Sequence, residues 1–334
     1  IILFLIMSCS QKDNIHKTKA KGIDPHKPMA WGHKQNVYVF ADDNVWKYAK
    51  KPLMENLERF HFTTENESYF ELKRAENIEQ FYKFNNLIFF CDWQSNDQIS
   101  EYVKKQLGKQ IEPEIKRNSV AIYPKDNLWA NDQFVLFLIG DNERNLLTLN
   151  LTMANNIFEL MTNKLKQRIK HQIYKTPIYS TSSFKNLAWS AEIPKNYIRY
   201  KSDKNFTSFL ARLRNKSDRY FSVYSEKIDK ATFGREWLKI KRAEISWKYY
   251  DEDFFKEKEI KLEKYNTAEF NGWKLSGRWQ NLKYAVGGAF QSFAFYDEKS
   301  QTAYLIDNSV YFPEGYKLQS LIELEIISNS FKLK

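Results

Sequence analysis

The sequence is poor in the features that identify a membrane-spanning protein, a disulfide scaffold or a metalloenzyme. No apolar run approaches the roughly 20 residues that a transmembrane helix requires. The chain has two cysteines, Cys9 and Cys91, so neither a disulfide framework nor a paired-cysteine metal site is expected. Its five histidines form no HExxH or His-x-His pattern. We therefore predict no metal and no cofactor.

Acidic residues are also scarce relative to basic ones, with 41 against 52, which gives a net charge of +11. A basic surplus favours partners that carry phosphate. The lysines are scattered along the chain, however, and no arginine-rich helix or aromatic and basic RNA-binding signature is present. We predict that nucleic acid is not a partner. A hydrophobic content of 43% excludes global disorder.

The strongest local signal lies at Cys9. Residues 1–7 are apolar, Ser8 is small, and the chain turns polar directly after Cys9. An apolar run that ends in a small residue is typical of a secretory signal, and a cysteine at this position resembles the bacterial lipobox. We expect residues 1–8 to be the remnant of a signal peptide and Cys9 to carry lipid. The alternative is a buried strand, which the polar stretch that follows does not favour.

Beyond Cys9, residues 9–35 predict a lipidated tether with a surplus of lysine, either a plain spacer or a segment attracted to an anionic membrane. Residues 36–180 predict an α/β domain, because strands at 37–40, 69–74, 86–91, 119–123 and 133–139 alternate with helices. These helices are expected at 43–57, at 78–84, from 96 or 97 to a stop at Gly108, and at 146–174. Cys91 falls in the strand at 86–91 and is expected to be a buried thiol.

Residues 184–334 predict an α+β domain. Strands are expected at 187–193, 209–213, 220–224, 273–279, 289–296 and 302–310, with helices at 233–249 and from about 318 to 330. The fold class is thus two α/β sandwich domains, the second a mostly antiparallel sheet flanked by helices.

Several short motifs in the second domain recur in one order: Gly277-Arg278-Trp279, Val286-Gly287-Gly288-Ala289-Phe290, Tyr296-Asp297 and Val310-Tyr311-Phe312-Pro313. Together with the segments 41–46 and 128–133, this set resembles domain-of-unknown-function family 4837, a family of exported bacterial lipoproteins. The resemblance spans roughly residues 36–334 and implies export and lipidation. The family usually has proline after the paired glycines, where this chain has Ala289. The element order of residues 184–334 also looks like the PsbP-like fold of small extracytoplasmic binding modules, an analogy of fold that does not fix function.

The best candidate site in the first domain is Asp42 and Asp43 with Trp46. Carboxylates at the carboxyl end of a strand lie where α/β folds often bind ligands. The alternative, which we favour, is that one aspartate caps the following helix and Trp46 packs beneath it. Trp129, ahead of the strand at 133–139, is a further candidate for a ligand or partner surface.

In the second domain the candidates are Arg278, Trp279, Gly287 and Gly288. The paired glycines could cradle a phosphate, but no Gly-Lys-Ser or Gly-Lys-Thr sequence and no clear helix start follows them. We therefore favour a bulge or tight turn between strands. Arg278 suits either an anion or a cross-strand pair. The 20 tyrosines and nine tryptophans suit either a glycan-binding surface or, for most of them, the cores.

We therefore predict a non-enzymatic lipoprotein that is anchored at the bacterial outer membrane. It would act as a binding or assembly module for an envelope protein or glycan. The alternative is an envelope hydrolase that uses Asp42 and Asp43 with Arg278.

Overall fold

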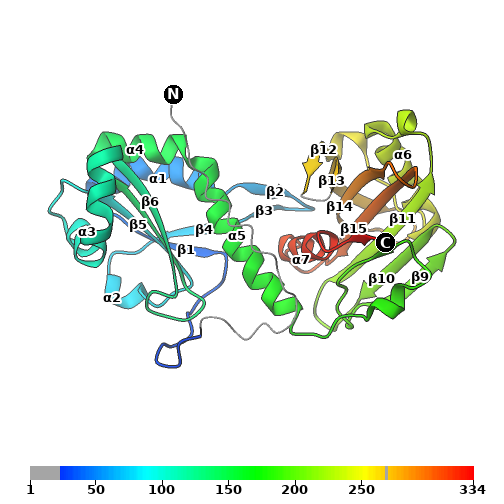
Figure 1. Cartoon of the computed structure of the whole chain (residues 1–334), viewed down its shortest axis with the longest axis horizontal. Coiled ribbons are helices and arrows are strands. Elements are labelled where there is room, and N and C mark those ends of the chain that lie inside the picture. The colour runs from blue at the N-terminus through cyan, green and yellow to red at the C-terminus, as the bar shows by residue number, and fades with distance from the viewer. Residues whose placement is uncertain (1–22, 268–269) are drawn as a thin grey trace.

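The computed structural model describes residues 23–267 and 270–334, and in them two α/β domains lie side by side (Figure 1). Residues 1–8 and Cys9 lie outside the described residues. The fold class predicted from the sequence is confirmed.

The N-terminal domain is built on a five-stranded sheet of order β4-β1-β5-β7-β6, in which only β6 is antiparallel. Its strands are β1 (Asn36–Phe40), β4 (Glu71–Arg74), β5 (Asn86–Asp92), β6 (Val120–Asp126) and β7 (Phe134–Gly140). Both faces of this sheet are covered, so β7 is buried along its whole length and reads as an unbroken apolar run.

Helices α1 (Asp43–Leu57), α4 (Glu143–Thr152) and α5 (Ala154–Ile173) contribute to the core on one face of this sheet. Helices α2 (Ile78–Phe81) and α3 (Gln98–Asn118) contribute to the core on the other. Cys91 is a free, buried thiol in this second core, and burial raises its pKa to about 12.

The C-terminal domain is a seven-stranded antiparallel sheet of order β12-β13-β14-β15-β11-β10-β9. Its strands are β9 (Ile198–Asp203), β10 (Phe206–Ala211), β11 (Asp218–Lys227), β12 (Ile260–Asn266), β13 (Asn271–Asn281), β14 (Val286–Asp297) and β15 (Thr302–Tyr311). Helix α6 (Arg235–Tyr249) packs on one face and α7 (Leu318–Ser328) on the other. Two short antiparallel strands, β8 (Trp189–Ser190) and β16 (Lys332–Leu333), pair with each other and join the residues after α7 to the start of the domain.

Four details differ from the sequence prediction. The predicted helix at 146–174 is two helices, because the chain leaves helical geometry at Met153. Helix α3 continues past Gly108, because Ile111 and Ile115 extend its buried stripe. The strand predicted at 187–193 is reduced to β8. The edge strands β9 and β12 were missed, because they are largely exposed and lack a clear apolar alternation.

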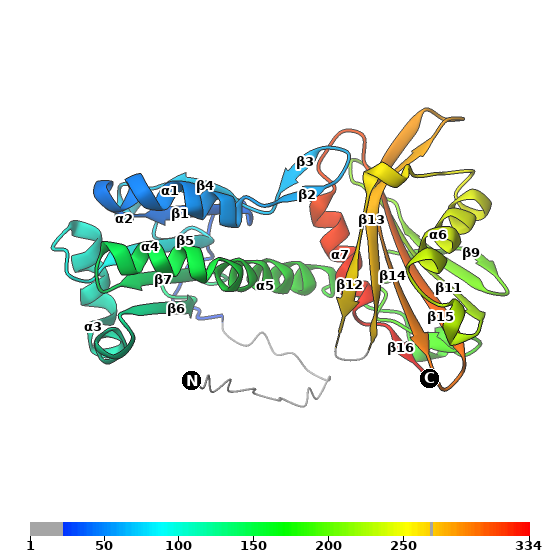
Figure 2. The same cartoon turned by 90° about the horizontal axis from the view of Figure 1, so that it is seen from above.

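The two domains share a joint made by a hairpin and a helix. The hairpin of β2 (Phe60–Phe62) and β3 (Asn66–Ser68) extends from the N-terminal domain to β13 (Figure 2). The buried carboxylate of Glu67 accepts the backbone N–H groups of Lys317 and Leu318 at 2.8 and 2.7 Å, so the hairpin caps α7. Leu318 and Ile322 of α7 then enter the core of the N-terminal domain.

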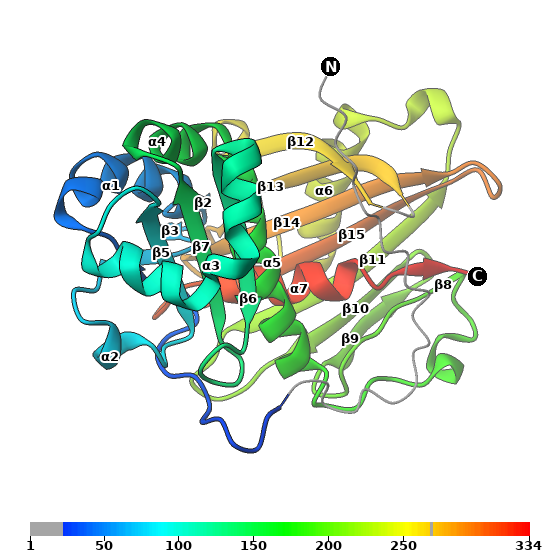
Figure 3. The ribbon, with the colours of Figure 1, turned by 60° about the vertical axis from the view of Figure 1, so that its left-hand side comes forward.

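A second contact joins α5 to the C-terminal domain, where α5 and α7 lie against each other (Figure 3). The carboxylate of Glu325 pairs with Lys166 of α5 at 2.7 Å and with Lys274 of β13 at 3.0 Å. Burial raises the pKa of Glu325, but the two ammonium groups outweigh burial and hold it at about 2. The joint is therefore both apolar and charged.

Residues 24–35, which the sequence places in the tether, pack against the N-terminal domain. The amide of Asn131 donates to the carbonyls of Asp24 and Lys27, each at 2.8 Å, and the backbone of Trp31 bonds to that of Lys83. These bonds satisfy the backbone of a stretch that has no regular structure of its own. Among the described helices, none combines the length and the apolar character that a membrane span needs.

Candidate functional site

The aspartates predicted as a site in the N-terminal domain have local structural roles. The Asp42 side chain accepts the N–H of Asn44 at 2.9 Å and caps α1. Asp43 is exposed and pairs with Arg74, whose hydrogen bond and charge lower the pKa of Asp43. Trp46 packs on the core beside Arg74. This geometry is that of the helix-cap alternative, and it gives the hydrolase alternative no support.

Other polar side chains at the carboxyl end of the parallel strands also form hydrogen bonds within the chain. Asp92 accepts the N–H of Gln94 at 3.0 Å, and Asp141 accepts the side-chain amide of Gln94 at 2.9 Å. Asn142 caps α4. The edge of the sheet where α/β folds often bind ligands is thus occupied by turns and caps.

The remaining predicted residues do not form one surface. Trp129 packs against Tyr82, Phe89 and Tyr102 in the N-terminal domain. Arg278 lies on β13 and its Nε donates to the carbonyl of Thr63 at 2.6 Å, so it contributes to the domain joint.

Gly287 and Gly288 lie inside β14, with regular register to Gln280 and Trp279, and the prediction of a bulge or turn at these positions is wrong. The turn falls at residues 282–285 instead. A Cβ on Gly288 would lie 2.1 Å from the carbonyl oxygen of Val310 and 2.7 Å from the Trp279 ring. The close approach of the backbone to this ring requires glycine there.

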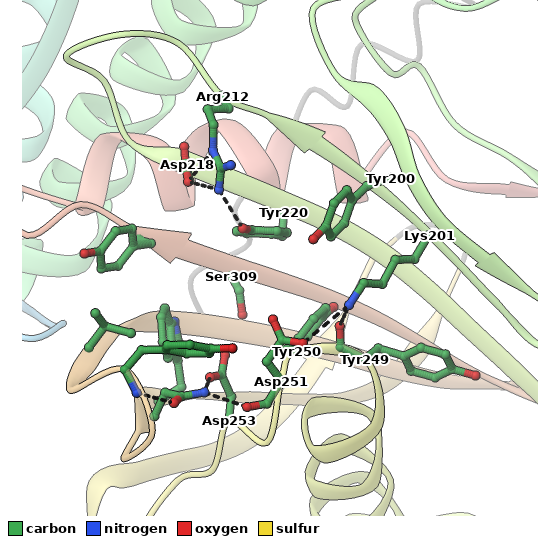
Figure 4. Close-up of a pocket in the computed structure, with 15 residues that line it drawn as sticks. Tyr200, Lys201, Arg212, Asp218, Tyr220, Tyr249, Tyr250, Asp251, Asp253 and Ser309 are labelled. Atoms are coloured by element: carbon green, nitrogen blue, oxygen red, sulfur yellow. Dashed lines mark hydrogen bonds and ion pairs between the residues drawn. The ribbon is translucent and has the colours of Figure 1, made fainter.

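Trp279 lines a cavity of about 260 Å³ on the α6 side of the C-terminal sheet (Figure 4). Its walls come from β9, β11, β13, β14 and β15, from the end of α6 and the loop that follows it, and from two connections between strands. The aromatic residues that line it are six tyrosines and one tryptophan: Tyr200, Tyr220, Tyr249, Tyr250, Tyr284, Tyr311 and Trp279. The charged residues are Lys201, Arg212, Asp218, Asp251 and Asp253.

The two cations of the cavity already have partners. Arg212 pairs with Asp218 at 2.7 Å. Lys201 donates to the backbone carbonyl of Tyr249 at 2.6 Å and lies 4.0 Å from the Asp251 carboxylate. Both cations are held by these contacts, which Figure 4 draws as dashed lines.

The loop after α6 places the acidic side chains. Asp251 and Glu252 have φ values of 55° and 71°, in the left-handed region that is unfavourable for most side chains. The buried amide of Asn281 holds this conformation by donating to the Asp251 carbonyl at 2.7 Å and to the Asp253 carboxylate at 2.8 Å. Burial raises the pKa of Asp253 to about 6, against the opposing effects of Asn281 and Arg242.

A buried ion pair lies beneath the cavity. The Arg242 guanidinium, fully buried on α6, donates to Asp307 at 3.2 Å and to the Ser309 hydroxyl at 3.3 Å, and Ser309 lines the cavity. The guanidinium also lies 4.2 Å from the centroid of the Phe290 ring. Tyr250 donates to Ser222 at 2.7 Å. These hydrogen bonds hold the polar groups beneath the cavity in place, while aromatic rings form its walls.

Of this cavity, the sequence prediction named only Trp279. The lining residues span positions 200–311, and no periodic pattern connects them. The one local signal is the run from Tyr249 to Asp253, where aromatic and acidic residues follow directly on a helix. Within residues 23–267 and 270–334, no group of three or more histidine, cysteine or acidic side chains is arranged to hold a metal ion.

In the comparison with known proteins, the two halves of the chain match two different family models. Residues 176–330 match a domain of unknown function, DUF4837, which confirms the resemblance for the C-terminal domain. Residues 30–174 match a second domain of unknown function, DUF8532. No curated protein matches the sequence.

Among solved structures, the chain is similar to the Ran-binding protein Mog1p of Saccharomyces cerevisiae, at 10% identity and a TM-score of 0.32, over 45% of this chain and 92% of that one. It is also similar to a protein of Bacteroides thetaiotaomicron, at 9% identity and a TM-score of 0.27, over 44% of this chain and 45% of that one. Likenesses at this level carry no argument about function.

Proposed function

We propose that this chain, whose two halves match the models of DUF8532 and DUF4837, is a lipid-anchored, non-enzymatic binding module of the bacterial envelope. The ligand occupies the aromatic cavity of the C-terminal domain. The anchor is the lipid on Cys9, and the membrane is the outer membrane.

The observation that carries this proposal is the composition of the cavity. Aromatic walls with a few fixed polar groups are typical of small-molecule sites, in which the rings supply contact area and the polar groups supply orientation. The polar groups here are held by Asn281, by the Arg212 and Asp218 pair and by the Ser309 and Arg242 contact. A volume of about 260 Å³ fits a small ligand or one group of a larger envelope partner.

The experiment for the binding site is a ligand-observed NMR screen of the full chain against sugars, amines, amino acids and short peptides. We expect hits that compete with one another and that are lost in Tyr220→Ala. The matched control is Tyr316→Ala, since Tyr316 is exposed and does not line the cavity. Hits that survive Tyr220→Ala, or a screen with no hits, would contradict the proposal.

The experiment for the anchor is membrane fractionation of Cys9→Ala. This variant should leave the membrane fraction, because it lacks the thiol directly after the apolar run and its small residue, to which the lipid would be attached. Cys91→Ala is the control and should stay in the membrane fraction, because Cys91 lies in the protein core. An unchanged distribution of Cys9→Ala would rule out lipidation at this residue.

A further inference from the structure

The cavity has the opposite sign of charge from the chain that contains it. The whole sequence carries a net charge of +11. The cavity is lined by Asp218, Asp251 and Asp253 against Lys201 and Arg212, which gives two positive and three negative charges, or −1. An acidic pocket in a strongly basic protein selects cations locally, because field lines concentrate in a concave site.

The negative charge falls on one residue. Arg212 and Asp218 neutralise each other at 2.7 Å, and Lys201 lies 4.0 Å from Asp251. Beneath them, Arg242 is paired with Asp307. Among the described residues, the Asp253 carboxylate accepts its side-chain hydrogen bond from the neutral amide of Asn281 and forms no ion pair within 4 Å.

The cavity that this carboxylate lines is walled by six tyrosines and one tryptophan. In Figure 4, Tyr200 and Tyr220 lie on one side of the cavity and Tyr250 and Asp251 on the other, with Ser309 between them. Aromatic faces attract cations through their quadrupole, and the attraction is strongest where water is excluded. A neutral ligand of the same shape gains contact area and hydrogen bonds, but not this attraction between its charge and the rings.

We propose that the cavity binds an ammonium group, with Asp253 as its main counter-ion, Asp251 as a weaker second one and the tyrosine rings as its walls. This inference rests on the proposed function, because it names the ligand class of the same cavity. Two sources supply this chemistry: the headgroup of an amine-bearing lipid, and the lysine side chain of a partner protein.

The test compares cations with neutral molecules of the same shape, by NMR titration of the full chain. Choline is paired with 3,3-dimethyl-1-butanol, and Nα-acetyl-lysine methylamide with Nα-acetyl-norleucine methylamide. We expect the cation of at least one pair to bind at least about tenfold more tightly than its neutral partner. The pair with the larger difference identifies the source, either a headgroup or a lysine.

The variants Asp253→Asn and Asp251→Asn should each weaken binding of that cation, Asp253→Asn by at least about tenfold. Asparagine keeps the hydrogen bond to Asn281 at position 253 and tolerates the left-handed backbone at position 251. Glu252→Gln is the matched control, because Glu252 lies between them but does not line the cavity. Its affinity should be unchanged.

The pH dependence separates a counter-ion from a structural residue. Choline keeps its charge at every pH, so its affinity should fall as pH drops through about 6, the value to which burial raises the pKa of Asp253. Asp253 is faced by Asp251 of its own loop, Arg242 of α6, Asp307 of β15 and Asn281 of β13. Lys201 of β9 and the Arg212 and Asp218 pair line the same cavity.

The outcomes distinguish this inference from the proposed function. Equal affinity for a cation and its neutral partner, or binding of a neutral sugar without any cation binding, would overturn the ammonium inference and leave the cavity as a ligand site. The absence of binding by cations, neutral partners and sugars alike would overturn both.

Discussion

The two domains differ in where their polar and aromatic residues are used. In the N-terminal domain, the carboxyl end of a parallel sheet carries Asp42, Asp92 and Asp141, yet these side chains cap helices or close turns. In the C-terminal domain, an antiparallel sheet leaves part of one face open beyond the end of α6, and tyrosines from several strands line the opening. The polar groups of the first region are used in local structure, whereas those of the second are held by partners within the chain and still line a cavity.

The domains are nevertheless coupled. Helix α7 belongs to the C-terminal sheet, but Glu67 of the N-terminal domain supplies its N-terminal cap. The cap residue Lys317 makes no side-chain capping bond of its own. The two regions therefore share a core and buried polar contacts across their joint.

The largest effect is expected for Glu67→Ala, which tests this coupling. The substitution leaves the N–H groups of Lys317 and Leu318 buried without an acceptor and removes a carboxylate from a helix N-terminus. The free energy of unfolding in urea should fall by about 3 kcal/mol. Glu65→Ala, an exposed change on the same hairpin, is the control and should have little effect. Similar losses for both variants would mean that the cap does not join the domains.

The next largest effect is expected for alanine substitutions at one glycine of each region, which should change the stability in opposite directions. Gly288→Ala places a methyl group against the Val310 carbonyl and the Trp279 ring and should destabilise the fold by about 2 kcal/mol. Gly108→Ala, in α3 of the N-terminal domain, meets nothing within 4 Å and should stabilise by roughly 1 kcal/mol through helix propensity. Thermal melts of the two variants should therefore shift in opposite directions. An unchanged or raised melting temperature for Gly288→Ala would show that β13 and β14 are not close-packed at this position, and a lowered one for Gly108→Ala would contradict the helix-propensity argument.

A smaller effect is expected for Asp42→Ala, which tests whether the N-terminal aspartate is structural. Loss of the cap should cost about 1 kcal/mol, and Asp42→Ser should recover most of it because serine also caps helices. Ligand binding to the C-terminal cavity should be the same in both variants. Failure of serine to restore stability would favour a role for the carboxylate other than capping.

The smallest effect concerns Asp253 without ligand. Burial raises the pKa of Asp253 from 3.8 to about 6, so ionisation is less favourable in the folded chain than in the unfolded one. Solvent screens this part-exposed carboxylate, so the free energy of unfolding should fall by less than about 1 kcal/mol as pH rises from about 4 to about 6 and then level off. Asp253→Asn should remove this dependence and be slightly more stable at pH 7. A steeper pH dependence in the variant would contradict the raised pKa.

The sequence predicted elements whose signals are local. The start of α1 followed from Asp42 ahead of an apolar period, and β7 followed from an unbroken apolar run. Edge strands such as β9 escaped prediction, because an exposed strand is specified by pairing with its neighbour and not by its own pattern. The end of α3 was misplaced for a related reason, since burial of Ile111 and Ile115 outweighs the low helix propensity of Gly108.

The sequence by itself determined two domains, their class, and the family resemblance of the C-terminal one, because periodicity and short motifs are properties of neighbouring residues. Only the tertiary structure decided that Asp42 is a cap and that Tyr200, Tyr220 and Asp253 share a cavity. Those residues lie on separate elements, and they meet through strand register and through the packing of α6 on the sheet. Such contacts depend on residues far apart in the chain, which no local pattern encodes.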